Sequence, residues 1–183
     1  MKKAISVTTL AVLVLGIAPI AMAVPNSNSI IEDGIEYYVQ TDKYIYDLGE
    51  NVEMLYRVTN LRSEEWRFNY IPPIADVIVA AKEGEVFNEI WHWSWDQTFP
   101  TGPVTFQLEP SESAELNGIW PQIDLNGSVE IEDHTQVLPG LYRASGVFYP
   151  TNNHIAVDVT ITPEPTSFFL LALGGLFLKR GRR

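Results

Sequence analysis

Apolar and polar residues alternate through much of the chain between residues 35 and 162. The alternation is clearest in the segments 52–60 and 154–161, which read VEMLYRVTN and HIAVDVTI. Successive side chains of a β-strand point to opposite faces of a sheet, so this pattern predicts strands with one buried and one solvated face. Strands of this kind are typical of antiparallel sheets.

Turn-forming residues separate these segments at short intervals, as at Pro72-Pro73, Asn126-Gly127 and Pro139-Gly140. No segment between residues 35 and 162 keeps a helical period for three turns. About nine short strands without intervening helices predict an all-β domain, an antiparallel β-sandwich at residues 35–162. A closed barrel is the alternative, but the uneven spacing of the segments favours the sandwich.

The first 23 residues have the three parts of a secretory signal peptide. Lys2 and Lys3 form a basic start, residues 4–18 are almost wholly apolar, and Ala21-Met22-Ala23 matches an A-x-A cleavage site. We expect signal peptidase to recognise Ala21 and Ala23 and to release a mature chain that begins at Val24. A retained anchor is the alternative, but the apolar run is shorter than the roughly 20 residues that a membrane span needs. The polar residues 24–34 are expected to form a flexible leader.

The other end of the chain carries a second pattern of the same kind. Pro163, Glu164 and Pro165 precede an uncharged segment at residues 166–178. A basic cluster closes the chain at Lys179, Arg180, Arg182 and Arg183. An apolar helix followed by basic residues stops in a membrane with its basic end in the cytoplasm. As a helix this segment is shorter than a hydrocarbon core of about 30 Å, which suits an anchor that is later removed.

This order of motif, apolar helix and basic tail resembles the PEP-CTERM sorting signal of Gram-negative bacteria, here at residues 163–183. The resemblance implies cleavage near Pro163-Glu164-Pro165 by an exosortase. It also implies export, a transient inner-membrane anchor and delivery to the cell surface or the extracellular matrix. Membrane contact is then limited to the sorting helix. A plain C-terminal tail anchor is the alternative.

Removal of both ends makes the charge of the chain strongly negative. Six of the twelve basic residues, but only Glu164 of the twenty-three acidic ones, lie in the end segments. The remaining 22 acidic and 6 basic residues give a net charge of −16. Because nucleic acids and anionic membranes bind basic surfaces, this charge argues against both as partners. The chain also has no cysteine, which excludes thiolate metal sites and cysteine nucleophiles.

Patterns for catalysis or metal binding are weak. His92, His134 and His154 are far apart in the sequence, and neither H-E-x-x-H nor G-x-S-x-G is present. We therefore expect no enzymatic activity, no cofactor and no metal site. Residues 124–133 hold several carboxylate and amide oxygens, so a calcium loop stays open there beside a simple Asn-Gly hairpin with a solvated acidic flank.

The segment 89–99, EIWHWSWDQTF, holds three of the five tryptophans. On one continuous strand Trp91, Trp93 and Trp95 would share a face, and His92 and Ser94 would share the other. We interpret the tryptophan face as core, because each buried indole removes a large apolar area from water. The alternative is an exposed aromatic platform for sugar rings. His92 is then expected to point to water or to the rim of the sandwich.

Trp91, Trp93, Ser94 and Phe99 are similar to the Trp-x-Trp-Ser and Phe motif of the BsuPI family, the bacterial intracellular proteinase inhibitors. The similarity continues through residues 48–161. His92 departs from the family, since an arginine is common at that place. The resemblance implies an immunoglobulin-like sandwich and points to proteinase inhibition.

We expect a non-catalytic, exported surface or extracellular-matrix protein with a BsuPI-like sandwich. The alternatives are an extracellular proteinase inhibitor and a carbohydrate (exopolysaccharide)-binding module. Inhibition requires an exposed and rigid loop, and the proline-containing segment 99–104 is the candidate, with Phe99, Pro100, Pro103 and Val104. The expected partners are signal peptidase and an exosortase during processing, and an extracellular protease or an exopolysaccharide afterwards.

Overall fold

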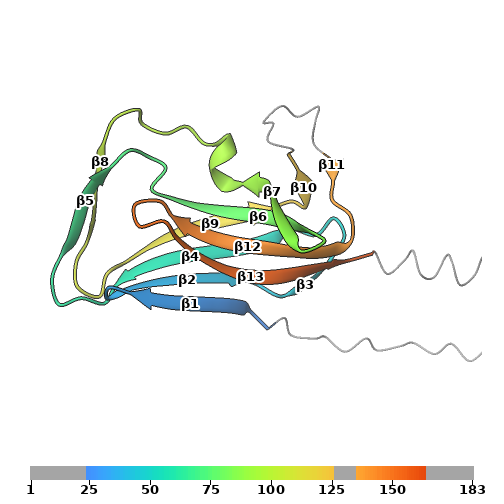
Figure 1. The fold of residues 1–183 in the computed structure, drawn as a ribbon, viewed down its shortest axis with the longest axis horizontal. Helices are drawn as coiled ribbons and strands as arrows, with labels where there is room; N and C mark the ends of the chain where they lie inside the picture. The colour runs from blue at the N-terminus through green and yellow to red at the C-terminus, as the bar shows by residue number, and fades with distance from the viewer. Residues whose placement is uncertain (1–23, 126–134, 164–183) are drawn as a thin grey trace, which may run out of the picture.

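The computed structural model of the chain describes residues 24–125 and 135–163. Within these ranges every regular element is a strand except one short 3-10 helix, so the expected all-β architecture is confirmed. Two main sheets face each other as a sandwich (Figure 1). The signal peptide expected at 1–23 and most of the sorting signal expected at 163–183 lie outside the described residues. Among the described residues, no helix is long and apolar enough to cross a membrane.

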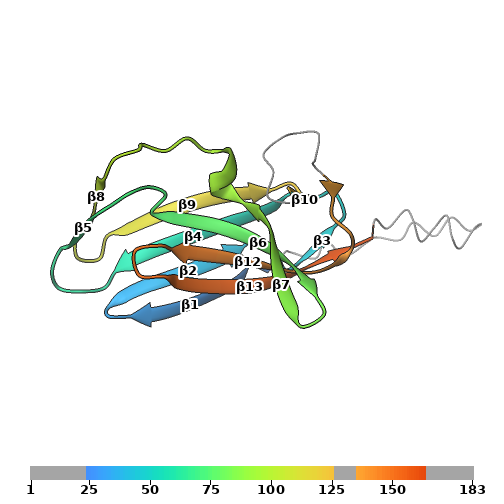
Figure 2. The ribbon, with the colours of Figure 1, turned by 45° about the horizontal axis from the view of Figure 1, so that its top comes forward.

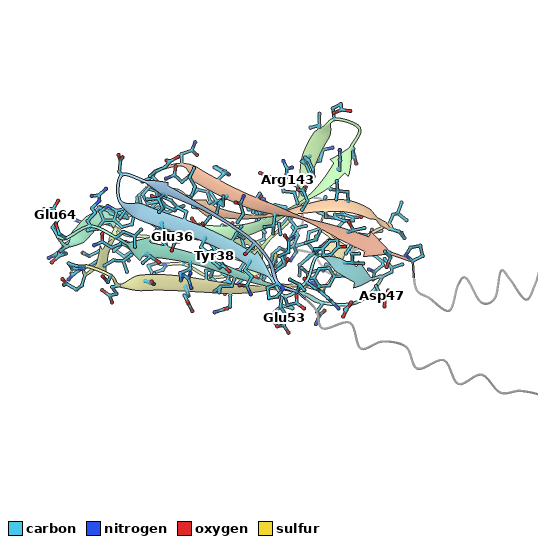
Figure 3. All side chains as sticks on the ribbon, turned by 90° about the horizontal axis from the view of Figure 1, so that it is seen from below. Glu36, Tyr38, Asp47, Glu53, Glu64 and Arg143 are labelled. Carbon is cyan, nitrogen blue, oxygen red and sulfur yellow. The ribbon has the colours of Figure 1, made fainter. Side chains whose placement is uncertain are left out.

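The first sheet is wholly antiparallel and has the order β1-β2-β4-β9. Its side chains alternate as expected, since Tyr37 and Val39 of β2 are buried while Glu36 and Tyr38 lie on the outer face seen in Figure 3. The strands are β1 (Asn26–Glu32), β2 (Ile35–Thr41), β4 (Val52–Asn60) and β9 (Ser113–Trp120).

The second sheet has the order β3-β13-β12-β6-β7 and is antiparallel except for β3, which runs parallel to β13. Its strands are β3 (Ile45–Asp47), β6 (Ala75–Glu83), β7 (Val86–His92), β12 (Gly140–Phe148) and β13 (Asn153–Thr162). Two short pairs complete the fold: β5 (Trp66–Tyr70) with β8 (Val104–Leu108) at one end, and β10 (Ile123–Asp124) with β11 (Thr135–Gln136) (Figure 2).

The core lies between the two main sheets and contains no disulfide, since the chain has no cysteine. The sheets approach closely at Tyr56 of β4, whose ring lies on the backbone of Gly146 in β12. A Cβ atom at Gly146 would come within 2.0 Å of that ring. Any side chain at position 146 would therefore displace Tyr56, which is 1% exposed.

The flexible leader expected at residues 24–34 is wrong, because Asn26–Glu32 forms strand β1 and pairs with β2 along its whole length. This strand buries little side-chain area, so its sequence lacks the apolar alternation by which strands are recognised. Backbone pairing holds it, together with two amides that reach the other sheet. Asn26 donates to the Asp158 carbonyl at 2.7 Å and Asn28 to the Ala156 carbonyl at 3.0 Å.

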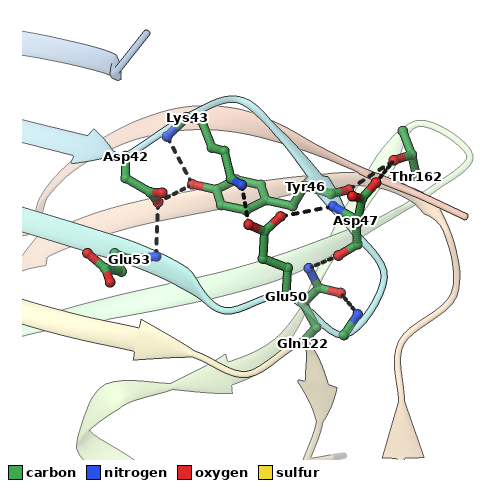
Figure 4. Close-up of polar contacts among 9 residues, drawn as sticks. Asp42, Lys43, Tyr46, Asp47, Glu50, Glu53, Gln122 and Thr162 are labelled. Carbon is green, nitrogen blue, oxygen red and sulfur yellow. Dashed lines mark hydrogen bonds and ion pairs between the residues drawn. The ribbon is translucent and has the colours of Figure 1, made fainter. Parts of the chain in front are cut away.

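Polar contacts fix the segment that carries the chain from β2 through β3 to β4 (Figure 4). The Tyr46 hydroxyl donates to the Asp42 carboxylate at 2.6 Å, and the same carboxylate accepts the Glu53 backbone N–H at 3.2 Å. Gln122 is fully buried and bridges the turn after β3. Its amide accepts from the Gly49 N–H at 2.7 Å and donates to the Asp47 carbonyl at 2.9 Å.

We expect Gln122→Ala to lower the free energy of unfolding by about 1–3 kcal/mol, because it removes two hydrogen bonds that each contribute roughly 0.5–1.5 kcal/mol. Urea denaturation measures this loss. Gln107→Ala is the matched control, since Gln107 is exposed and its amide donates to Glu109 at the surface, and it should change stability by less than about 0.5 kcal/mol. Equal effects of the two substitutions would contradict the assigned role of Gln122.

Candidate functional site

The tryptophan segment does not form one continuous strand. Strand β7 ends at His92, and residues Trp93–Asp96 form the 3-10 helix η1. Trp91 is 7% exposed and belongs to the core, as expected. Trp93 and Trp95 are only partly buried. The expectation that all three tryptophans share one face of a strand is wrong, because the strand ends at His92. The three indoles therefore do not make a single exposed aromatic strip.

A buried carboxylate accounts for the turn at the end of β7. Asp76 of β6 is 0% exposed, on the face of β6 that points away from the core. Its carboxylate accepts hydrogen bonds from the Ser94 N–H at 3.0 Å and the Ser94 hydroxyl at 2.5 Å. The Val77 N–H at 2.9 Å and the Tyr149 hydroxyl at 3.2 Å also donate to it. These bonds draw Ser94 onto β6, which ends the extended backbone and starts η1.

His92 completes this cluster and does not simply point to water or to the rim of the sandwich, as was expected. Its Nδ1 lies 3.2 Å from the Asp76 carboxylate and its Nε2 lies 3.1 Å from the Glu89 carboxylate. The imidazole also stacks on the Trp95 ring, with centroids 4.2 Å apart. Burial by itself lowers the pKa of His92. The hydrogen bond and charge of Asp76, with those of Glu89, outweigh burial and raise the pKa above its ordinary value.

The Gln97–Pro103 segment leaves η1 as an irregular loop that reaches β8. Its two prolines, Pro100 and Pro103, are exposed as expected, but the ends of the candidate segment 99–104 turn inward. Phe99 is half-buried and packs edge-on against Trp93, with ring centroids 6.1 Å apart. Val104 is also half-buried, where β8 begins. The loop is therefore anchored at both ends and exposed in the middle.

An apolar cleft of about 400 Å³ lies beneath this loop. Its walls come from both main sheets, from η1 and from the loop, so residues far apart in sequence meet there. The walls include Tyr56 of β4, Leu116 of β9, Phe148 of β12, Trp93, Phe99 and Phe106. This volume lies within the roughly 300–1,000 Å³ range of binding pockets. The family motif thus contributes Trp93 and Phe99 to the cleft, Ser94 to the turn and Trp91 to the core.

Sequence reasoning missed the residues that organise this site. Asp76 is the one acidic residue in the otherwise apolar run IADVIVA, and that isolation is a signal that could have identified it. Tyr56 and Tyr149 carry no comparable signal. Among the described residues no group of three or more metal-ligating side chains occurs. Most of the possible calcium loop at 124–133, and the sorting residues Glu164 and Pro165, lie outside the described part of the chain.

The raised pKa of His92 predicts a dependence of stability on pH. The folded protein binds the proton more tightly than the unfolded chain, so the stabilising contribution is complete below the unfolded pKa of about 6.5. It is lost as the pH rises through the higher folded-state pKa. We therefore expect the free energy of unfolding, measured in urea, to fall as the pH rises above about 6.5.

His92→Gln should abolish most of this fall while leaving the folded state intact enough to measure. His154→Gln is the control, because His154 is exposed on β13 and should keep the wild-type dependence. An unchanged pH profile in His92→Gln would show that the Asp76–His92–Glu89 cluster is not the source.

The solved structures that resemble this chain are only distantly similar to it in fold. A β-glucosidase from Listeria innocua bound to laminaribiose has a TM-score of 0.41 and 13% identity over 70% of this chain and 16% of the enzyme. A β-glucosidase from Erythrobacter marinus has a TM-score of 0.42 and 10% identity over 75% of this chain and 16% of the enzyme. The chain thus spans about a sixth of these enzymes.

The CARDB domain of a Pyrococcus furiosus protein has a TM-score of 0.36 and 17% identity over 77% of this chain and 98% of the domain. No curated protein matches the chain in sequence. The model of the BsuPI family, described as intracellular proteinase inhibitor, matches residues 39–153. This match covers well over half of the chain and includes the Trp91–Phe99 motif, Asp76 and every wall of the cleft. The chain therefore belongs to the BsuPI family of intracellular proteinase inhibitors.

Proposed function

We propose that the chain is a non-catalytic, exported surface or extracellular-matrix protein whose BsuPI domain binds a partner protein through the Gln97–Pro103 loop. The observation that carries this proposal is the loop itself, exposed in its middle and anchored at both ends. Trp93 and Phe99 hold its start, and Asp76 fixes η1 below it. Association loses less entropy when a binding loop is already ordered.

Proteinase inhibition is the form of this function that the family favours. A protease active site accepts an exposed segment, and Pro100 and Pro103 limit the backbone freedom of this one. The carbohydrate-binding alternative has less support, because it relied on three tryptophans in one exposed strip. Trp91 is in the core and Trp95 is stacked on His92.

The sandwich is proposed to be immunoglobulin-like. In this proposal strands β2, β4 and β9 take the places of A, B and E in that fold, and β6, β12 and β13 take those of C, F and G. The order β13-β12-β6 within the second sheet supports this assignment. So does the placement of β12 beside β6, although β7, η1 and β8 to β11 intervene in the sequence.

Export and sorting belong to the same proposal and rest on the sequence. The basic start at Lys2 and Lys3, the apolar run and Ala21-Met22-Ala23 support removal of a signal peptide. Pro163-Glu164-Pro165, the apolar segment and the basic tail support processing by an exosortase. The net charge of −16 after both cleavages suits a protein that must stay soluble in a crowded outer layer.

We expect the mature protein to inhibit at least one protease in a panel of secreted serine, cysteine and metalloproteases, with one inhibitor bound per enzyme. Thr101→Trp places a bulky side chain at the exposed middle of the loop. It should weaken inhibition by about tenfold or more, since a clash at the centre of an interface removes its main contacts. The inhibition constant from steady-state assays measures this effect.

Ser29→Trp is the matched control, because Ser29 is exposed on β1, on the edge strand of the first sheet. It should leave the inhibition constant unchanged. Equal inhibition by wild type and Thr101→Trp would remove the loop from the contact. No inhibition across the panel would reject the inhibitor form of the proposal.

The sorting proposal has its own test. In the producing cell, Glu164→Ala should leave uncleaved protein in the inner membrane, whereas the wild-type protein reaches the cell surface or the medium. Glu109→Ala removes an exposed carboxylate elsewhere and should be sorted normally. Immunoblots of cell fractions compare the two variants, and normal release of Glu164→Ala would contradict exosortase processing.

A further inference from the structure

The imidazole of His92 lies between two carboxylates. Its Nδ1 is 3.2 Å from a carboxylate oxygen of Asp76, and its Nε2 is 3.1 Å from a carboxylate oxygen of Glu89. A carboxylate ion only accepts hydrogen bonds, and a neutral imidazole has a single N–H group. A neutral ring can therefore donate to one of the two carboxylates, whereas a protonated ring donates to both. The arrangement in the structure needs the second proton on His92.

No other cation contacts the buried carboxylate of Asp76 in the described part of the chain. Asp76 is 0% exposed, and its ion pair there is with His92. The Tyr149 hydroxyl also donates to Asp76, and it stays neutral because burial, with the charge of Asp76, raises its pKa. Other charged or titratable side chains on η1, β12 and β13 have no hydrogen bond or ion pair to either residue; they are Asp96, Arg143, His154 and Asp158.

Trp95 connects this imidazole to the helix η1. The two rings stack with centroids 4.2 Å apart and planes 16° apart. The face of an indole attracts a cation, so a protonated His92 holds Trp95 more strongly than a neutral one. Ser94, the residue before Trp95, is bonded to Asp76, and the loop begins at Gln97. Asp76 and His92 therefore hold η1 together, and η1 sets where the loop starts.

Loss of the proton affects these contacts unequally. One nitrogen of His92 then carries no hydrogen and faces a carboxylate that cannot donate to it. The Glu89 side chain is 59% exposed and can turn to water, whereas Asp76 is fully buried and cannot. Asp76 then lacks a countercharge, and the attraction between the imidazole and Trp95 weakens. Deprotonation therefore loosens η1, while the strand pairing of the two main sheets is untouched.

We propose that the Asp76–His92–Glu89 cluster is a proton-dependent switch, which holds η1 and the Gln97–Pro103 loop in place for the partner and releases them as the pH rises. The inference rests on the proposed partner-binding function and adds its regulation. Burial lowers the pKa of His92, and the two carboxylates raise it by more. The folded protein therefore keeps the ring protonated up to a higher pH than the unfolded chain does, and release occurs above about pH 6.5.

NMR relaxation of backbone amides measures the switch in the mature protein without any partner. The Ser94 N–H donates to Asp76 and the Gln97 N–H donates to the Ser94 carbonyl, so both amides report on η1. Their order parameters should be near the rigid value of about 0.85 at about pH 5.5 and fall toward about 0.6 by about pH 8.5. The amides of β4 should keep their values, because the sandwich stays folded.

The His92 ring, followed by NMR, should titrate with the same midpoint as this fall. His92→Gln should abolish the fall, since an amide does not titrate in this range. Glu89→Gln should move the midpoint to lower pH, because one of the two carboxylates that favour the proton is gone. It changes an exposed side chain, so it keeps the test available if His92→Gln does not fold. His154→Gln is the control, and it should keep the wild-type curve.

Constant order parameters in η1 over this pH range, or a fall that His92→Gln leaves unchanged, would overturn the switch. Where a protease of the panel is inhibited, the inhibition constant should rise several-fold with pH for the wild type and less for His92→Gln. The protease's own pH dependence is common to both comparisons. Equal pH dependence of the two would overturn the regulation and leave the proposed function standing. A working switch without inhibition of any protease would support the switch and reject the inhibitor form of the function.

Discussion

The buried carboxylate of Asp76 is the interaction on which the site depends. Burying a charge is costly unless hydrogen bonds replace its hydration. Here Ser94 supplies two donors, Val77 and Tyr149 supply one each, and His92 adds a fifth contact. These groups come from β6, β7, η1 and the segment after β12. One side chain therefore joins four parts of the chain. A buried hydrogen-bond network of this kind specifies a single arrangement, because any arrangement that leaves some of its polar groups without partners is unfavourable.

The direction of the chain after β7 follows from this carboxylate. Once Ser94 is bound to Asp76, Trp93 cannot continue the strand and lies at the cleft instead. The loop to β8 then starts above the cleft, and Phe99 closes against Trp93. Ser94, the serine of the family motif, thus sets the direction that the backbone takes after β7. Of the tryptophans in the motif, Trp91 lies in the core and Trp93 lines the cleft.

Much of the sandwich could be predicted from the sequence, because its central strands obey the alternation that burial of one face requires. β2, β4 and β13 do so along their whole length. β1 was missed since hydrogen bonds, with little apolar burial, hold it to its neighbours. The turn at Ser94 was missed because it depends on Asp76, eighteen residues away in sequence. Local patterns carry no information about such a contact, although the isolated acid in β6 was visible.

The two long sides of the sandwich are joined differently. Along one side, the amides of Asn26 and Asn28 connect β1 directly to the backbone of β13 in the opposite sheet. Along the other side, β9 contacts β6 and η1, and residues of all three line the apolar cleft. The polar N-terminal strand therefore connects the two sheets along the first side, although it contributes little to the core.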